Sequence, residues 1–174
     1  MKLIPKKKAP SLTIPRVGGG NWSLADQRPE NFLLLVFYRG YHCPICKSYL
    51  EKLNGLLGDA SKQGITVFVA SGDTEDRARQ SQDEWEIDDL ELGYGMTVAQ
   101  MNEWGLYTSA AIKEEEPAVF GEPGLFLIKP DQTIYYVAYN SMPMGRPDLR
   151  EVIKFVEFVL EKDYPARGEK IVDI

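Results

Sequence analysis

The sequence predicts an α/β fold with one mixed β-sheet that carries helices on both faces. Residues 32–38 and 65–70 are apolar runs of strand length, and residues 44–57 between them have the apolar spacing of a helix. A strand–helix–strand unit of this kind is right-handed and has parallel strands. Residues 125–128 and 134–139 are two further apolar runs, and the short Pro–Asp turn between them predicts an antiparallel hairpin.

Length and composition predict one globular domain spanning residues 1–174. The net charge of -6 argues against a general nucleic-acid or anionic-membrane binder. Nine acidic and two basic residues in segment 73–91 predict a solvated face. No stretch reaches the roughly 18 apolar residues of a membrane span, and the start has no apolar signal segment. We therefore expect a cytoplasmic protein.

Short N-terminal strands precede the first long strand. Residues 12–17 and 21–24 are predicted edge strands, separated by a glycine-rich turn, and they form an N-terminal β extension. The elements expected between the two halves of the sheet are, in order, a helix at 73–85 capped by Ser71 or Asp73, a helix at 97–104 capped by Thr97, and an exposed loop at 113–117.

A long helix is predicted near the end of the chain, over residues 147–162. Pro147 suits the first helical position, and the charges at the two ends match the helix dipole. Its predicted core stripe consists of six apolar residues: Leu149, Val152, Ile153, Val156, Val159 and Leu160. The three tryptophans, Trp22, Trp85 and Trp104, are expected to be packing groups.

The only two cysteines of the chain form the motif Cys43-Pro44-Ile45-Cys46, at the start of the helix predicted for residues 44–57. Pro44 has no N–H to leave unpaired, so it suits the first helical position and makes Cys43 the N-cap. The expected apolar stripe of this helix comprises Cys46, Leu50, Leu53 and Leu57, with Gly58 as its C-terminal stop.

This placement predicts a reactive Cys43. Its sulfur would face free backbone amides and the positive end of the helix dipole, which together lower the pKa of a thiol by about one unit. Arg39 and His42 are local groups that could lower it further, and Arg146 is a remote one. Cys46 lies one turn further in, so it should be less exposed and have the higher pKa. We therefore expect Cys43 to attack and Cys46 to resolve through a disulfide.

Structural alternatives stand beside this hypothesis. Both cysteines could be inert core residues, and a metal site is a second option, although two cysteines and one histidine fall short of the four ligands that zinc usually takes. Likewise, His42 could simply pack on the helix start, Arg39 could be a surface residue, and Arg146 could pair with Asp148 or the tail. We expect no metal and no other cofactor.

The motif and its flanks resemble a known family. The segments 37–46 (FYRGYHCPIC), 141–149 and 163–168 are similar to the peroxiredoxin-like branch of the alkyl hydroperoxide reductase / thiol-specific antioxidant family. The resemblance covers most of residues 5–168 and implies a thioredoxin-like fold.

By this resemblance, Cys43 matches the peroxidatic position and Cys46 the resolving position. Pro123 falls where thioredoxin-fold proteins carry a cis-proline beside the active cysteine. The chain also departs from typical peroxiredoxins. Val36 and Gly40 occupy the positions of the usual Pro and of the usual Thr or Ser, and Gly121-Glu122-Pro123 stands where an Arg enters the strand. Arg39 could take the place of that Arg.

The leading hypothesis is a thiol-based oxidoreductase that reduces hydroperoxides and is restored by a thioredoxin- or glutathione-type reductant. Its expected catalytic residues are Cys43, Cys46, Arg39, His42 and Pro123. A thioredoxin- or glutaredoxin-like protein disulfide reductase is the alternative that the missing Thr and Arg favour. A redox-sensing module without turnover is the alternative that an acidic insert over the site would favour. A homodimer is left open.

Overall fold

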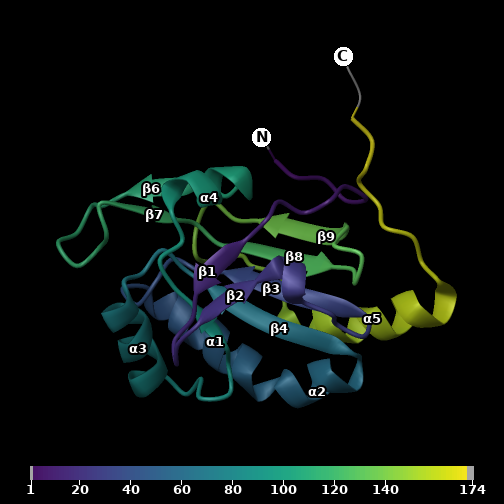
Figure 1. The fold of residues 1–174 in the computed structure, drawn as a ribbon, viewed down its shortest axis with the longest axis horizontal. Helices are drawn as coiled ribbons and strands as arrows, with labels where there is room; N and C mark the ends of the chain where they lie inside the picture. The colour runs from purple at the N-terminus through teal and green to yellow at the C-terminus, as the bar shows by residue number, and fades with distance from the viewer. Residues whose placement is uncertain (1, 172–174) are drawn as a thin grey trace.

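The computed structural model describes residues 2–171 and has a five-stranded mixed sheet at its centre (Figure 1). The strands of this sheet are β3 (Phe32–Phe37), β4 (Ile65–Ala70), β5 (Leu92–Gly93), β8 (Gly124–Ile128) and β9 (Ile134–Tyr139). Their order is β5-β4-β3-β8-β9, with β3 parallel to β4 and antiparallel to β8. The predicted parallel unit and the predicted β8–β9 hairpin are both confirmed.

Both faces of the central strand β3 are buried, as its unbroken apolar sequence predicts. Successive side chains of a strand point to opposite faces of the sheet. Leu34 and Val36 therefore belong to the core on one face, whereas Leu33 and Leu35 belong to the core on the other.

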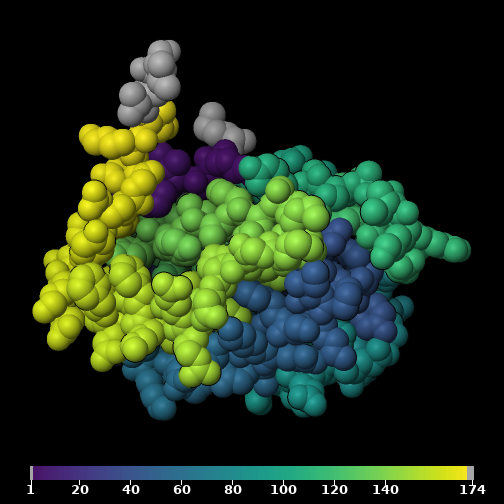
Figure 2. All heavy atoms as spheres, turned by 180° about the vertical axis from the view of Figure 1, so that it is seen from behind, coloured from purple at the N-terminus to yellow at the C-terminus, as the bar shows by residue number. Residues whose placement is uncertain are grey.

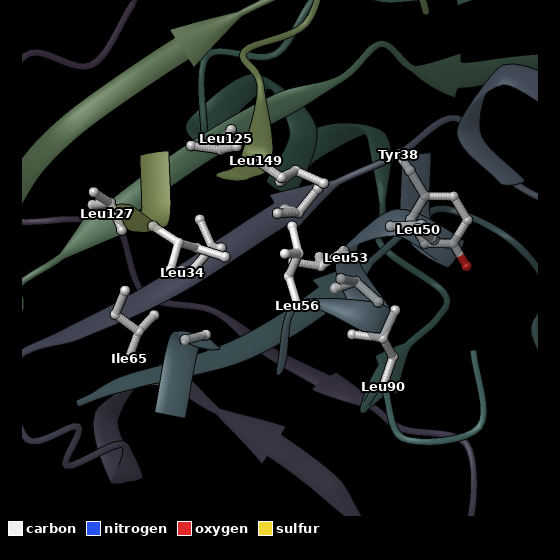
Figure 3. Packing of buried hydrophobic residues seen from close by; sticks show 14 of the residues in the cluster. Leu34, Tyr38, Leu50, Leu53, Leu56, Ile65, Leu90, Leu125, Leu127 and Leu149 are labelled. Atoms are coloured by element: carbon white, nitrogen blue, oxygen red, sulfur yellow. The ribbon is translucent and has the colours of Figure 1, made fainter. Parts of the chain in front are cut away.

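The first of these cores lies under helices α1 (Pro44–Gly55), α2 (Leu57–Lys62) and α5 (Leu149–Lys162). Figure 3 shows side chains from β3, α1 and α5 meeting in it, with Leu34, Leu53 and Leu149 near one another. Because the apolar stripe of α1 is anchored here, the start of the helix is held at the end of β3.

The opposite face is covered by the hairpin of β1 (Thr13–Pro15) and β2 (Asn21–Ser23), and by α4 (Val98–Glu103). Trp22 stacks on Phe68 of β4 with the ring centroids 4.0 Å apart. Trp104, which follows α4, meets Phe37 edge-on at 5.3 Å. The predicted packing role of the tryptophans is confirmed, because all three are buried.

The remaining elements are a short 3-10 helix, η1 (Leu24–Asp26), the helix α3 (Glu75–Glu84), and a hairpin of β6 (Thr108–Ala110) and β7 (Val119–Gly121). The predicted loop at 113–117 is the tip of this hairpin. The hairpin itself was not predicted, because its strands have only three residues each and no apolar run. None of the described helices is long and apolar enough to cross a membrane.

The predicted end of α1 is wrong. The helix stops at Gly55, Leu56 caps it, and Gly58 lies inside the separate helix α2. Gly58 keeps a negative φ and so continues a helix instead of ending one. The break moves the core contact by one residue, since Leu56 is buried and Leu57 is only half-buried.

Two predicted helix starts are also wrong. Thr74 caps α3 through a bond from Arg77 N, in place of Ser71 or Asp73. Asp148 caps α5 through a bond from Glu151 N, so Pro147 precedes the helix. A side-chain oxygen at the N-cap accepts a hydrogen bond from a free backbone N–H of the first turn, so Thr74 and Asp148 set where these helices start.

Two leucines on the helices under the sheet differ in burial and so test the assignment of the core. Leu160, which was predicted to be in the core stripe of α5, is 45% exposed, whereas Leu50 of α1 is fully buried. We expect Leu50→Ala to lower the free energy of unfolding by about 2–5 kcal/mol, because it leaves a cavity under β3. Leu160→Ala is the matched control and should change it by about 0.5 kcal/mol or less. Chemical denaturation measures both, and equal losses would contradict this assignment of the core.

Candidate active site

The candidate site begins with a turn that carries the chain from the end of β3 to the start of α1. Gly40 in this turn has φ +132°, a conformation that side-chain-bearing residues rarely adopt. A Cβ at this position would lie 2.5 Å from Oδ1 of Asp73. Asp73 also accepts a hydrogen bond of 2.8 Å from the backbone N–H of Tyr41. The turn is therefore fastened to the segment that follows β4.

Cys43 ends this turn and caps α1. The backbone N–H of Cys46 donates to Cys43 Sγ at 3.3 Å, and Pro44 occupies the first helical position. The predicted N-cap is confirmed. The sulfur thus satisfies one of the helix amides that would otherwise have no partner.

The two thiols differ in acidity. A hydrogen bond from the Cys46 thiol is the main cause that lowers the pKa of Cys43 to about 6, and the Cys46 amide and the charges of Arg39 and Arg146 add to it, although burial opposes it. Donating this bond, together with burial, raises the pKa of Cys46 far above that of an ordinary cysteine. The predicted order of the two pKa values is confirmed.

Both cysteines are reduced and buried: Cys43 is 2% exposed and Cys46 is not exposed at all. The predicted difference in exposure is thus small. With so little of Cys43 exposed, small or extended substrates are favoured over bulky ones.

Arg39 lies in the turn, but two carboxylates hold its side chain. Its Nε lies 3.5 Å from Glu122 Oε2, and its Nη2 lies 3.9 Å from Glu116 Oε1. Glu116 comes from the tip of the β6–β7 hairpin and Glu122 from the residue after β7, and both side chains are almost buried. The guanidinium carbon also lies 4.6 Å from the ring centroid of Phe120.

His42 packs against the same hairpin. Its ring meets that of Phe120 at a centroid distance of 4.7 Å, and within residues 2–171 neither ring nitrogen has a hydrogen-bond partner. Burial and the charge of Arg39 lower the pKa of His42, so the imidazole is neutral near pH 7. The structure brings His42 beside Arg39, but it shows no hydrogen bond from His42 to either cysteine.

Pro123 is buried directly before β8, whose first residue, Gly124, pairs with Phe37 at the end of β3. Its position at this end of the sheet agrees with the family resemblance, but the expected cis peptide bond before it is absent. The described chain, residues 2–171, contains no cis peptide bond. The trans form is the intrinsically preferred state of a bond before proline.

Arg146 joins the site from the segment between β9 and α5. Its Nη1 donates to Cys46 Sγ at 3.5 Å, and its Cζ lies 3.7 Å from the ring centroid of Tyr49. Figure 2 shows this segment, in yellow-green, against the dark blue segment that contains the start of α1. Sequence reasoning named Arg146 only as a remote cation, because 100 residues separate it from Cys46.

A groove of about 530 Å³ lies between β9 and the start of α5. Arg146 lines it together with apolar and aromatic side chains, among them Tyr136, Val152 and Phe155. Within the described part of the chain, no group of three or more histidine, cysteine or acidic side chains is placed to hold a metal ion.

Comparison with known proteins relates this geometry to a family. The model of the AhpC/TSA family matches residues 5–137. Two curated relatives from strains of Mycobacterium tuberculosis, both named "Putative peroxiredoxin", are 32% identical over 82 residues, which are 47% of this chain and 52% of each relative. The chain thus spans about half the length of the curated relatives it matches.

Solved structures show the same fold at low sequence identity. A reduced 2-Cys peroxiredoxin of Plasmodium vivax superposes with a TM-score of 0.77 at 15% identity, covering 98% of this chain and 92% of that chain. A cysteine-to-serine mutant of the peroxiredoxin 6 of Arenicola marina gives 0.79 at 12% identity, covering 92% and 75%. A peroxiredoxin-like protein of Aquifex aeolicus gives 0.72 at 15%, covering 91% and 89%. The thioredoxin-like fold is confirmed.

The hydrogen bond between the thiols makes a prediction about acidity. In the wild type, the rate of alkylation of Cys43 should rise with pH around a midpoint near 6, the pKa of its thiol. About nine-tenths of the sulfur would then be thiolate at pH 7. In Cys46→Ala the thiol donor is lost, and the midpoint should move toward about 8.5, the value of an ordinary cysteine.

Cys43→Ala is the control: without Cys43 as acceptor, burial still raises the pKa of the Cys46 thiol, so Cys46 should not titrate near 6. Mass spectrometry of the alkylated protein at each pH identifies the reacting residue. An unchanged midpoint in Cys46→Ala would show that the second thiol does not set the acidity of the first.

Proposed function

The chain belongs to the AhpC/TSA family, and from that premise we propose that it is a thiol peroxidase that reduces hydroperoxides through Cys43 and Cys46. One observation carries the proposal: the sulfur of Cys43, whose pKa is lowered to about 6, caps a helix and accepts a hydrogen bond from the backbone N–H of Cys46, the residue that bears the second thiol. A thiolate at neutral pH with an adjacent thiol is what attack followed by resolution requires.

The catalytic cycle has two steps, followed by reduction of the disulfide. The Cys43 thiolate attacks one peroxide oxygen, the O–O bond breaks, and the alkoxide leaves as an alcohol after it takes a proton; Cys43 becomes a sulfenic acid. The sulfur of Cys46 then displaces the sulfenic oxygen, which leaves as water, and a Cys43–Cys46 disulfide forms. A dithiol reductant of the thioredoxin type, or glutathione, reduces this disulfide and restores both thiols.

His42 and Arg39 are the proposed helpers of the first step. His42 is neutral and has no hydrogen-bond partner within residues 2–171, so its N–H is free to donate to a substrate oxygen. Arg39 favours the thiolate through its charge, although its guanidinium is also engaged by Glu116 and Glu122. Pro123 would shape the site from the start of β8.

The same proposal includes the cellular location and the oligomeric state of the protein. Two cysteines that must cycle with a thiol reductant fit a reducing compartment, and we place the protein in the cytoplasm. A homodimer is compatible with this function but is not required by the site, because both thiols come from one chain.

A second function, reduction of protein disulfides, is favoured by one observation. The two carboxylates on Arg39 leave its guanidinium less available to a peroxide, whereas exchange between a thiol and a disulfide needs only the acidic Cys43 and its partner.

Peroxide consumption separates the two functions. With a thiol reductant present, we expect Cys43→Ser to lower the rate of peroxide turnover more than about a hundredfold, because the covalent route is lost with its nucleophile. In a separate assay without reductant, Cys46→Ser should consume one equivalent of peroxide and stop at the sulfenic acid, which mass spectrometry detects.

Reduction of insulin by the same proteins is the companion assay. If wild type reduces insulin but consumes peroxide no faster than Cys43→Ser does, the protein is a disulfide reductase and the peroxidase proposal fails.

A further inference from the structure

The sulfur of Cys46 has a cationic hydrogen-bond donor of its own. Arg146 reaches it across 100 residues of sequence, with Nη1 at 3.5 Å from Sγ. A charged donor aimed at a fully buried thiol is more than a neutral S–H needs, because a thiol sulfur is a weak acceptor.

The helix that carries Cys46 also holds Arg146 in place. The guanidinium lies over the ring of Tyr49, one turn further along α1, at 3.7 Å from Cζ to the ring centroid. The hydroxyl of Tyr49 donates to the carbonyl oxygen of Pro147 at 2.8 Å, and Asn140 donates to the carbonyl oxygen of Gly145 at 2.9 Å. These bonds fix the backbone on both sides of Arg146.

The charge of Arg146 is not neutralised by a carboxylate. No acidic side chain of residues 2–171 forms an ion pair with it, and its Nη2 is buried without a partner there. Asp148, the nearest acidic residue in sequence, pairs with Lys52 at 2.7 Å instead. Arg39 is the opposite case, since Glu116 and Glu122 both approach its guanidinium.

We propose that Arg146 is a positioning residue for the second step, which holds Cys46 Sγ and stabilises its thiolate as that sulfur attacks the oxidised Cys43. This inference rests on the proposed function. In the step, Cys46 gives up its proton, its thiolate forms the S–S bond with Cys43, and the S–O bond of the sulfenic acid breaks. The hydroxide that leaves takes up a proton and departs as water.

The physical need for such a residue follows from burial. Desolvation disfavours a thiolate, so a buried Cys46 without a cation stays protonated and reacts slowly. The charge of Arg146 opposes this effect at Cys46. Once Cys43 is oxidised, it no longer accepts the hydrogen bond from the Cys46 thiol that keeps the proton on Cys46, and Arg146 becomes the dominant partner of the sulfur.

An aromatic disulfide such as dithiobis-nitrobenzoate tests the step without peroxide. Attack by Cys43 releases one coloured thiolate, and attack by Cys46 on the resulting mixed disulfide releases a second. We expect Arg146→Met to leave the rate of the first phase within about threefold and to slow the second about threefold to tenfold. Each unit by which the pKa of Cys46 rises lowers its thiolate fraction about tenfold, and the higher nucleophilicity of the more basic sulfur restores about 0.4–0.5 of that loss on a logarithmic scale.

Three further variants make the test specific. Arg146→Lys keeps the charge and should restore part of the second phase, whereas Tyr49→Phe keeps the ring but removes the hydroxyl that holds Pro147, and should slow this phase less than Arg146→Met does. Arg150→Met removes an exposed charge four residues along and should match the wild type. If Arg146→Met does not fold, as circular dichroism would reveal, Arg146→Lys and Tyr49→Phe carry the comparison.

Two outcomes are distinct. Equal second phases in all variants would overturn the role of Arg146, whatever the protein does with peroxide. A slowed second phase, together with no sulfenic acid in Cys46→Ser after peroxide, would support the role of Arg146 and refute the peroxidase function. If peroxide does react, trapping with a dimedone-type reagent should find more sulfenic acid in Arg146→Met than in the wild type.

Discussion

The hydrogen bond from the backbone N–H of Cys46 to the sulfur of Cys43 is the contact on which the site depends. It makes Cys43 the cap of α1 and adds to the acidity of its thiol, because the same amides that lack helical partners stabilise a negative sulfur. The contact exists only if α1 starts at Pro44, and this start is set by the turn after β3. Packing of the apolar stripe of α1 against β3 holds the start of the helix at the end of β3. The core under the sheet therefore also positions the two cysteines.

The two arginines near the dithiol differ in whether carboxylates surround them, and this difference separates their roles in the site. Arg39 is shared by Glu116 and Glu122, so its net effect at Cys43 is reduced, and the helix start and the Cys46 thiol do most to lower the pKa there. Arg146 has no carboxylate partner among the described residues and touches the second sulfur. The acidity of the first thiol thus comes mostly from α1, whereas the second sulfur is supported by the segment that follows the edge strand β9. Substitutions at these two places should affect different steps.

The features that depend on local sequence could be predicted. The apolar runs located β3, β4, β8 and β9, and the Cys-Pro pair located the N-cap, because each rests on spacing or on the missing N–H of proline. The features that depend on contacts between distant residues could not. Nothing near Arg146 in the sequence indicates Cys46 or Tyr49, and nothing in the acidic loop indicates that Glu116 reaches Arg39. The starts of α3 and α5 were missed for a smaller reason, since several oxygen side chains compete for each cap.

Gly40 explains why this site differs from the typical pattern of its family, in which the resemblance places a Thr or Ser at this position. Here the backbone has φ +132°, and the carboxylate of Asp73 fills the space that a Cβ would need. A hydroxyl residue would therefore have to move Asp73, which also holds Tyr41 N, and would strain the turn that presents Cys43. In this chain the space beside Gly40 is taken by the buried carboxylate of Asp73, which fixes the turn. Any hydrogen bonds to a substrate oxygen must then come from elsewhere, and His42, neutral and without a partner in the described chain, is the nearest donor in sequence to the attacking sulfur.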